Sequence, residues 1–315
     1  MAIGIDPTVD FAFKRLLGSP EHSRITVHFL NAVLGASPRI TDVTILNPFL
    51  AKDFEEDKLS VLDVLATDEH GRRLNVEMQT SLPIGMRKRL AFYASSLYVD
   101  QLTEGRDYAL LQPAVNICVL DAVMFPDVVD LHLDFRLRDD QYRETLTDDM
   151  QIHTIELPKY QRPVNNEVIT DPLEKWVYFL RFATSSTASE LSARLVDDEF
   201  GEAVGVLEMI SKSQEERMLY QARLKFQRDE QARLKYAEQE GRAKGEAEGR
   251  AKGEAEGRAE GRAEGEARGE QIGRIRFLLQ LLGKTELSHE EFAEMDLPAL
   301  EAMAADLQCQ LPSNN

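Results

Sequence analysis

The chain has 315 residues, of which 43% are hydrophobic and 29% charged, and this globular composition excludes a fibrous or wholly disordered protein. We expect one main domain with helical additions. The formal net charge of −18 excludes nucleic-acid binding through overall attraction, so any contact with DNA or RNA requires a local basic patch. The cysteines, Cys118 and Cys309, are too few and too far apart for a disulfide framework or a zinc site, and they favour a reducing compartment.

The sequence also argues against export and membrane insertion. Its first residues, MAIGIDPTVDFAFKR, contain no basic segment followed by an apolar run. No stretch approaches the roughly 18 uninterrupted apolar residues that a membrane span needs. We therefore expect a cytoplasmic protein with no membrane partner.

Two helices open the chain. Asp6 can cap free backbone amides and Pro7 suits the first helical position, so the first helix is predicted to begin there and to close at Gly18. A second helix is predicted from about Arg24 to Leu34, ending in Gly35.

The next part of the chain alternates strands with one long helix. Short runs rich in β-branched residues predict strands in ITDVTILNPF, KLSVLDVLAT, PAVNICVL and IHTIELP, the third apolar enough to be central in a sheet. Helical spacing predicts a long helix over MRKRLAFYASSLYVDQLTEG, ending near Gly105. The order of these elements indicates an α/β core that ends near residue 160.

From Pro172 onward only helices are predicted. We divide the chain into an α/β domain, a helical extension, a glycine repeat and a C-terminal helical hairpin, at 1–183, 184–240, 241–273 and 274–315. The hairpin has two short amphipathic stretches around a turn, whose expected use is packing with itself or with a second copy in a homo-oligomer. Its second stretch is acidic and lacks suitable base-contacting residues, which disfavours a DNA-reading helix-turn-helix.

In the repeat, glycine recurs at every fourth position from Gly241 to Gly273. Four residues turn a helix through about 400°, so the glycines would form a slowly drifting stripe, and each costs a helix roughly 1 kcal/mol relative to alanine. Alanines and the i,i+4 pairs Glu240–Lys244 and Glu248–Lys252 favour a helix. Two interpretations stay open: a marginal helix that a partner backbone approaches along the glycine line, or a flexible charged linker.

The stretch RRLNVEMQT alternates apolar and polar side chains, as a half-buried strand does. A three-residue turn over 69–71, with its glycine in the left-handed conformation, pairs Asp68 with Arg72. Counting back along both strands places Asp63 opposite Glu77.

Asp63 and Glu77 would then have Cβ atoms roughly 4.5 to 5.5 Å apart, where two like charges destabilise a sheet unless a cation neutralises them. Gln79 projects from the same face and can offer its amide to the same ion or to a water. Two carboxylates, a backbone carbonyl and several waters form the oxygen environment that Mg²⁺ or Mn²⁺ prefers. Such an ion can activate a water and stabilise the charge on a phosphodiester under attack.

The alternative is that these acids line the solvated side of a two-stranded unit. Asp63 interrupts an otherwise apolar run, however, and a buried Asp there needs a partner. Basic residues nearby in sequence offer a seat for phosphates, although exposed helix-face charge is the ordinary interpretation of the last three: Arg72, Arg73, Arg87, Lys88 and Arg89.

Other chemistries find no support in the sequence. The histidines show no HExxH or paired metal spacing, and the motifs GxSxG, GxxxxGK[ST] and GxGxxG do not occur. The repeated glycines follow no strand, so they do not form a phosphate-binding loop.

Four blocks occur in order along roughly residues 1–180: DFAFKRLL, LSVLDVLATDEHGRRLNVEMQT, RLAFYASSLYVDQLTEGRDYALLQPAVNICVLD and IHTIELPKY. Together they resemble the recombination-promoting nuclease and transposase group of the PD-(D/E)XK nuclease superfamily. The resemblance implies a restriction-endonuclease-like α/β fold, with a mixed sheet flanked by helices, and metal-dependent DNA cleavage.

Carried over by residue, the resemblance implies that Asp63 and Glu77 bind the metal ion, with the Met78 carbonyl as a further ligand. Gln79 stands where the superfamily motif most often has Lys. Members of this group commonly carry Gln there, yet Gln has no charge to stabilise a developing hydroxide and can only orient the water.

Three further residues are candidates for accessory roles. Asp10 can act on the metal site from the first helix, with first-turn charge complementing the helix dipole as the alternative. Arg89 and Tyr93 can face the cleft from the helix after the hairpin, with core packing as the alternative for Tyr93.

The leading hypothesis is a DNA endonuclease that uses Mg²⁺ or Mn²⁺ and acts in recombination or mobile-element biology. The alternative is a catalytically weak nuclease-like protein that binds DNA or assembles oligomers through its C-terminal helices.

Overall fold

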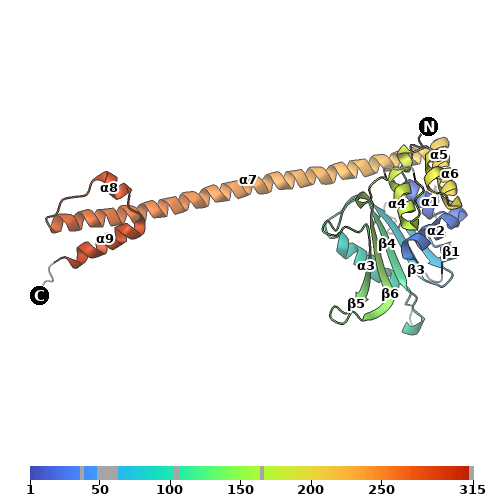
Figure 1. Ribbon diagram of the computed structural model, residues 1–315, viewed down its shortest axis with the longest axis horizontal. Helices are drawn as coiled ribbons and strands as arrows, with labels where there is room; N and C mark the ends of the chain where they lie inside the picture. Colours follow the sequence, from blue (N-terminus) through green and yellow to red (C-terminus); the bar gives the residue numbers. More distant parts are fainter. Residues whose placement is uncertain (36–38, 48–62, 103–106, 164–166, 312–315) are drawn as a thin grey trace. The chain divides into compact units, whose positions relative to one another are not determined.

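The computed structural model describes residues 1–35, 39–47, 63–102, 107–163 and 167–311 (Figure 1). The chain forms two compact units, Met1–Ala232 and Arg233–Asn315. Each unit contains a hydrophobic cluster of its own.

In the described residues, the first unit is built on a mixed six-stranded sheet in the order β1-β2-β3-β4-β6-β5. β4 pairs in parallel with β3 and β6, whereas β1–β2, β2–β3 and β5–β6 are antiparallel. The strands are Val43–Ile45 (β1), Val64–Asp68 (β2), Arg73–Gln79 (β3), Ala114–Leu120 (β4), His132–Arg138 (β5) and Thr145–Glu156 (β6). The predicted α/β fold with a mixed sheet flanked by helices is confirmed.

β3 is more buried than its alternating pattern predicts, because its five inner residues, Asn75 and Glu77 among them, are all buried. Every residue of β4 is buried, as predicted for a central strand. The sequence analysis missed β5, although Leu133, Phe135 and Leu137 alternate there with charged residues, as in a strand with one apolar face. Its side chains are half-buried or exposed at the sheet edge. The start of the predicted strand KLSVLDVLAT lies outside the described residues.

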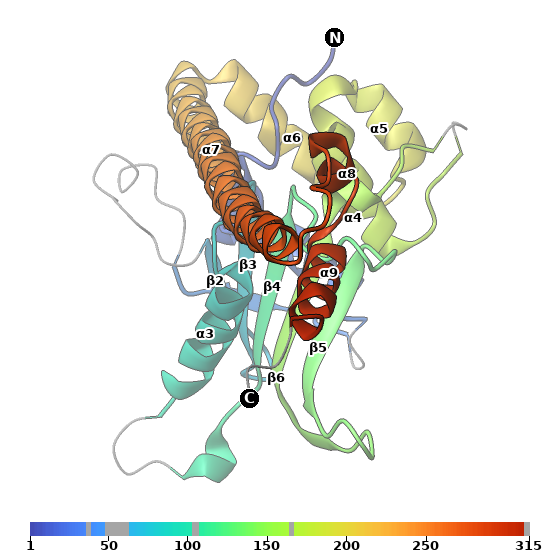
Figure 2. The same ribbon diagram turned by 90° about the vertical axis from the view of Figure 1, so that its left-hand side faces the viewer.

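Helices cover both faces of this sheet (Figure 2). Leu74 and Val76 of β3 belong to the main core, together with residues of helices on one face. On the other face, Cys118 of β4 packs with Met86 and Leu90. The helices are α1 (Asp10–Leu17), α2 (Ser23–Leu34), α3 (Met86–Val99), α4 (Pro172–Phe182), α5 (Ala188–Arg194) and α6 (Asp198–Lys212). Met86 and Leu90 are two of the four buried residues of α3.

Residues of α4, α5 and α6 lie in the same hydrophobic cluster as the sheet. The first part of the predicted extension, 184–240, therefore packs on the α/β core. Short 3-10 turns link these elements at Pro20–His22, Tyr108–Leu110, Leu157–Lys159 and Ala183–Ser185.

Two predicted helix ends are wrong. α1 begins at Asp10, because the Asp6 carboxylate accepts hydrogen bonds from the amide (2.9 Å) and hydroxyl (2.7 Å) of Thr8 and so closes a turn ahead of the helix. α3 ends at Val99 and is capped at Asp100, short of the predicted end near Gly105. The predicted closure of α1 at Gly18 and of α2 at Gly35 is confirmed, with Gly35 at φ 54°.

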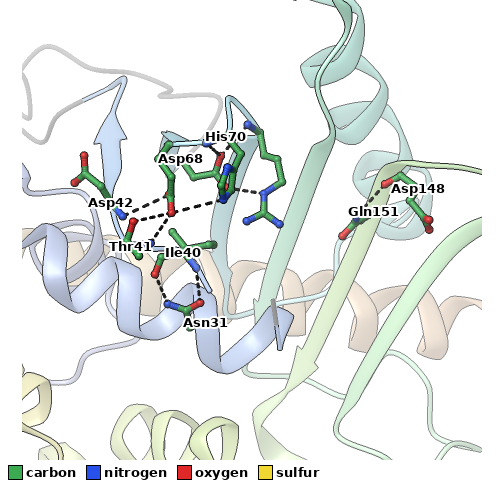
Figure 3. A network of polar contacts seen from close by, with 10 residues as sticks. Asn31, Ile40, Thr41, Asp42, Asp68, His70, Asp148 and Gln151 are labelled. Carbon is green, nitrogen blue, oxygen red and sulfur yellow. Dashed lines mark hydrogen bonds and ion pairs between the residues drawn. The ribbon is translucent and has the colours of Figure 1, made fainter. Parts of the chain in front are cut away.

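The turn between β2 and β3 matches its prediction. Gly71 has φ 82°, and the Asp68 amide donates to the Arg72 carbonyl at 3.3 Å. The Asp68 carboxylate accepts the amides of His70 (3.0 Å) and Arg72 (2.9 Å), as Figure 3 shows around the labelled Asp68 and His70. Local hydrogen bonds therefore fix the register of the hairpin.

Glu69, at the tip of the same turn, accepts hydrogen bonds from the amide and the hydroxyl of Thr41, each at 2.8 Å. Partial desolvation raises the pKa of Glu69, but these bonds and one from the Asp42 amide outweigh it and lower the pKa to about 2. The turn is thus tied to the segment before β1, where Asn31 holds Ile40 through two further bonds (Figure 3).

Helix α7 (Gln214–Leu281) begins in the first unit and includes the glycine repeat. A Cβ added at any glycine from Gly241 to Gly273 would meet no atom of the described residues within 4 Å. Lys244 pairs with Glu240 at 2.7 Å as predicted, whereas Lys252 pairs with Glu256 at 3.8 Å and not with Glu248, because the two acids flank it at the same spacing.

The second unit closes around the end of α7. Ile275, Leu278 and Leu279 pack against Phe292, Leu300, Ala304 and Leu307 of α8 (His289–Ala293) and α9 (Leu297–Cys309). Ser288 and Glu291 form a capping box at α8, and Asp296 caps α9. No helix in the described residues combines the length and apolar character that crossing a bilayer requires.

Candidate active site

Glu77 lies on β3 with its carboxyl group almost fully inside the protein. Its residue is 1% exposed, and Oε1 accepts a hydrogen bond from Asn75 Nδ2 at 2.8 Å. Oε2 is buried and has no hydrogen-bond partner among the described residues. Burial raises the pKa of Glu77 to about 7; the Asn75 bond lowers it, and the Asp63 charge raises it further. One oxygen of this buried carboxyl group therefore has no hydrogen-bond partner among the described residues, and the group gives up its proton only near neutral pH.

Asp63 stands just before β2. Its Oδ2 accepts a hydrogen bond from the Met78 amide at 2.9 Å, and its Oδ1 lies 3.4 Å from Lys14 Nζ. Burial raises the pKa of Asp63 to about 6; the charge of Asp10 adds to this rise, and Lys14 lowers it. A second carboxyl group with a raised pKa therefore lies at the same strand end.

The strand register brings these two acids together. Val64 pairs with Val76 across β2 and β3, so the next position outward places Asp63 opposite Glu77, as predicted from the turn. The electrostatic effect of Asp63 on Glu77 agrees with this placement. Their role as metal ligands stays a prediction.

Lys14 is the residue that the sequence analysis missed. It lies on α1 with a side chain 12% exposed, and its Nζ is 3.1 Å from Asp10 Oδ1 as well as 3.4 Å from Asp63. Asp10 thus reaches Asp63 through its charge and through a shared cation. The sequence did contain a signal for it, because Asp10 and Lys14 in DFAFKRLL are four residues apart, the spacing of an ion pair on a helix.

Gln79 and the Met78 carbonyl complete the end of β3. The Arg73 amide donates a hydrogen bond to the Pro113 carbonyl, and the Gln79 carbonyl accepts one from the Asp121 amide at 2.9 Å. Every second residue of β3, counted from Arg73, therefore forms its backbone hydrogen bonds with the β4 side. The Met78 carbonyl therefore points toward the β2 side, where Asp63 lies. The Gln79 amide lies near enough to Glu77 to lower its pKa by partial hydrogen bonding, but too far for a full hydrogen bond.

A model described as PD-(D/E)XK nuclease family transposase matches residues 7–237. The chain belongs to this family. No curated protein and no solved structure matches the chain. The match agrees with the resemblance drawn from the four sequence blocks, and it covers all the site residues described above, together with α4, α5, α6 and the start of α7.

For a PD-(D/E)XK nuclease family transposase, a divalent metal is the expected cofactor, and the donors at the end of β3 fit one. In the described residues, no group of three or more His, Cys, Asp and Glu side chains could hold a metal ion. The donor set is instead two carboxylates and a carbonyl, and Mg²⁺ commonly binds one or two carboxylates and completes its shell with waters and substrate phosphates. The unpartnered Glu77 Oε2 is the observation that favours such an ion.

The basic residues of this family member's α3 have separate contacts. Arg89 donates to the Tyr93 hydroxyl at 2.7 Å, and its charge lowers the pKa of Glu77, so Arg89 lies on the Glu77 side of α3. Arg87 donates to the Met124 carbonyl at 2.9 Å, with its guanidinium 4.5 Å from the Phe125 ring centre. Lys88 is exposed. The three basic residues predicted to bind phosphates together therefore have different surroundings, and Arg89 is the one whose charge acts on Glu77.

The two arginines of the hairpin are also engaged. Arg72 pairs with Asp68, which is buried, and Arg73 donates to the Thr67 hydroxyl at 3.3 Å. Glu156, at the end of β6, accepts the Phe125 amide through Oε1. Its Oε2 has no hydrogen bond, like Glu77 Oε2, but it lies 3.1 Å from the Lys159 ammonium group, an ion-pair partner that Glu77 Oε2 lacks.

Proposed function

We propose that this chain is a DNA endonuclease that depends on Mg²⁺ or Mn²⁺ and hydrolyses phosphodiester bonds in recombination or mobile-element biology. The observation that carries the proposal is the buried Glu77 carboxyl group, which has an unpartnered oxygen and lies opposite Asp63. Family membership supports a nuclease, and raised pKa values are common where a site needs charge for chemistry.

Asp63, Glu77 and the Met78 carbonyl would hold the ion. When bound, it supplies an acidified water and stabilises charge on the phosphate. Gln79 orients the water through its amide. Lys14 supplies the positive charge that Gln79 lacks, since its ammonium group lies 3.4 Å from the Asp63 carboxylate.

Cleavage of supercoiled plasmid with Mg²⁺ or Mn²⁺ tests this proposal. Asp63→Asn or Glu77→Gln is expected to lower the rate about a hundredfold or more, because each removes a charged ligand worth several kcal/mol in the transition state. Glu156→Gln is the matched control, a buried acid at the end of β6 that already pairs with Lys159, and it should cleave like the wild type. Equal rates for Glu77→Gln and the wild type would contradict the proposal.

We also propose that the second unit forms homo-oligomers. Phe277 and Leu281 lie four residues apart on α7 and are 61% and 56% exposed, so they leave an apolar strip beside the cluster of α8 and α9. A chain that ends at Ala232 keeps the core of the first unit and should show a smaller mass by light scattering than the full chain, apart from the lost residues. A full chain that is already a monomer would contradict this second proposal.

A further inference from the structure

The part of α7 within the first unit is held against the domain at three points. Glu216 lies 3.3 Å from Arg15 of α1, and the Tyr220 hydroxyl accepts the Asp6 amide at 2.9 Å. Farther along, Gln231 Nε2 donates to the Thr80 carbonyl at 3.3 Å. Thr80 directly follows Gln79, so α7 passes the end of β3 at which Asp63 and Glu77 lie.

The middle of this part of α7 is basic, although acidic residues stand at both ends of it, at 215–216 and 229–230. Residues 217–228 contain four basic and no acidic side chains, in a chain with a net charge of −18. Lys225 and Arg228 are exposed and form no ion pair with another described residue. Arg228 precedes Gln231 by three residues, which is about 4.5 Å along a helix axis, so its charge lies within one turn of the contact with Thr80.

The spacing places these charges on one side of the helix. Arg217, Gln221, Lys225 and Arg228 follow each other by four, four and three residues, the steps that keep side chains on one face. The arginines nearest the candidate site are already bonded: Arg72 to Asp68, Arg87 to the Met124 carbonyl and Arg89 to Tyr93. The basic side of α7, together with the exposed Lys88 of α3, therefore offers charge beside the site for a polyanion.

We propose that this surface, Lys225 and Arg228 with Arg217 along the same side of α7, binds the phosphate backbone of the DNA that the candidate site cleaves. The choice of DNA rests on the proposed function. Lysine and arginine contacts to phosphates fix the position of a duplex without reading its sequence. Since the chain is acidic overall, its affinity for DNA depends on this local surface and is steeply salt-dependent.

Anisotropy titrations of a labelled duplex, with EDTA present and salt varied between about 50 and 200 mM, test the proposal. The variant is Lys225→Gln with Arg228→Gln. Losing two phosphate contacts should weaken binding roughly tenfold or more and reduce the slope of log K against log salt by about 1.8. Both side chains are exposed, so the melting temperature should not change.

The matched control is Arg242→Gln with Lys244→Gln. It removes the same two residue types and the same net charge from α7, at positions 81% and 69% exposed that pair with Glu246 and Glu240. The control should bind like the wild type. If both double variants lose affinity and slope equally, overall charge governs binding and the proposed surface is overturned; wild-type binding by Lys225→Gln with Arg228→Gln also overturns it.

The same titrations separate this proposal from the nuclease proposal. Because EDTA removes divalent metals, binding is measured without cleavage. A chain that binds DNA through Lys225 and Arg228 but cuts no plasmid with Mg²⁺ or Mn²⁺ would contradict the nuclease and support this surface. A wild-type chain that binds no duplex at the lowest salt would contradict the surface.

Discussion

The candidate site and the glycine repeat treat charged side chains in opposite ways. At the site, Glu77 is 1% exposed, and burial raises its pKa to about 7. In the repeat, Glu240 and Lys244 are 49% and 69% exposed and lie 2.7 Å apart, one turn from each other on α7. Exposed pairs of this kind contribute little to stability, because water screens them.

This difference shows that an ionised side chain destabilises the fold when it is buried and has little effect on stability when it is exposed. A buried carboxyl group with an unpartnered oxygen lowers the stability of the fold when it ionises, so retaining one suggests a use for its charge. The acids of the repeat keep their water and support a helix that many glycines weaken. Matched substitutions in the two regions can therefore test whether burial determines the role of a charge.

The largest expected contrast is between Lys14→Met and Lys244→Met. Lys14 lies between Asp10 and Asp63, and removing its charge should lower plasmid cleavage about a hundredfold, as for other groups that stabilise transition-state charge. Lys244→Met should cleave at the wild-type rate. Rates are compared at saturating DNA, and melting curves establish that both variants fold.

A second substitution makes this test more specific. Gln79→Lys in the Lys14→Met chain restores a positive charge at the position where the superfamily motif usually has it, and it should recover part of the activity. If Lys14→Met alone retains full activity, Lys14 does not replace the missing motif lysine.

The next contrast concerns pH and stability. The raised pKa of Glu77 means that the folded protein holds this proton more tightly than the unfolded chain does, so the contribution of Glu77 to stability is greatest below about pH 4.5 and is lost as pH rises to about 7. Because glutamine does not ionise, Glu77→Gln avoids this loss of stability. It should raise the free energy of unfolding at pH 8 by on the order of 2 kcal/mol. Glu246→Gln, whose side chain is 67% exposed, should change it little.

Urea denaturation of the three proteins at pH 4 and pH 8 measures this effect. The wild type and Glu77→Gln should be close at pH 4, where both side chains are neutral. A Glu77→Gln chain that is less stable than the wild type at pH 8 would show that the ionised carboxylate is well compensated in the fold.

Local chemistry explains why the hairpin could be predicted from sequence. The left-handed Gly71 and the Asp68–Arg72 pairing follow from a three-residue turn, and they set Asp63 opposite Glu77 without any knowledge of the remaining fold. The buried pattern of β4 was equally clear. These features depend on neighbours in sequence or on uniform burial.

The features that sequence could not supply depend on distant contacts. Lys14 reaches Asp63 only because packing places α1 beside the start of β2, and no periodicity encodes that distance. The approach of Gln231 to Thr80 joins positions 151 residues apart. The edge strand β5 is a different case: Leu133, Phe135 and Leu137 alternate with charged residues, so its pattern was present in the sequence and was overlooked.

The smallest expected effect lies in the repeat and addresses whether it is a helix or a linker. Gly253 lies within α7, and a Cβ added there meets no described atom within 4 Å, so Gly253→Ala should stabilise the helix locally by about 1 kcal/mol. Hydrogen exchange of backbone amides around residue 253 should slow about fivefold, the factor that corresponds to this energy. Gly18→Ala is the opposite case, because its Cβ would lie 2.8 Å from the Lys14 carbonyl and should destabilise the end of α1. If amides around residue 253 exchange at the rate of a free peptide in both the wild type and Gly253→Ala, the repeat is a linker in solution. The contrast between its charged side chains and those of the site would then reflect disorder as well as exposure.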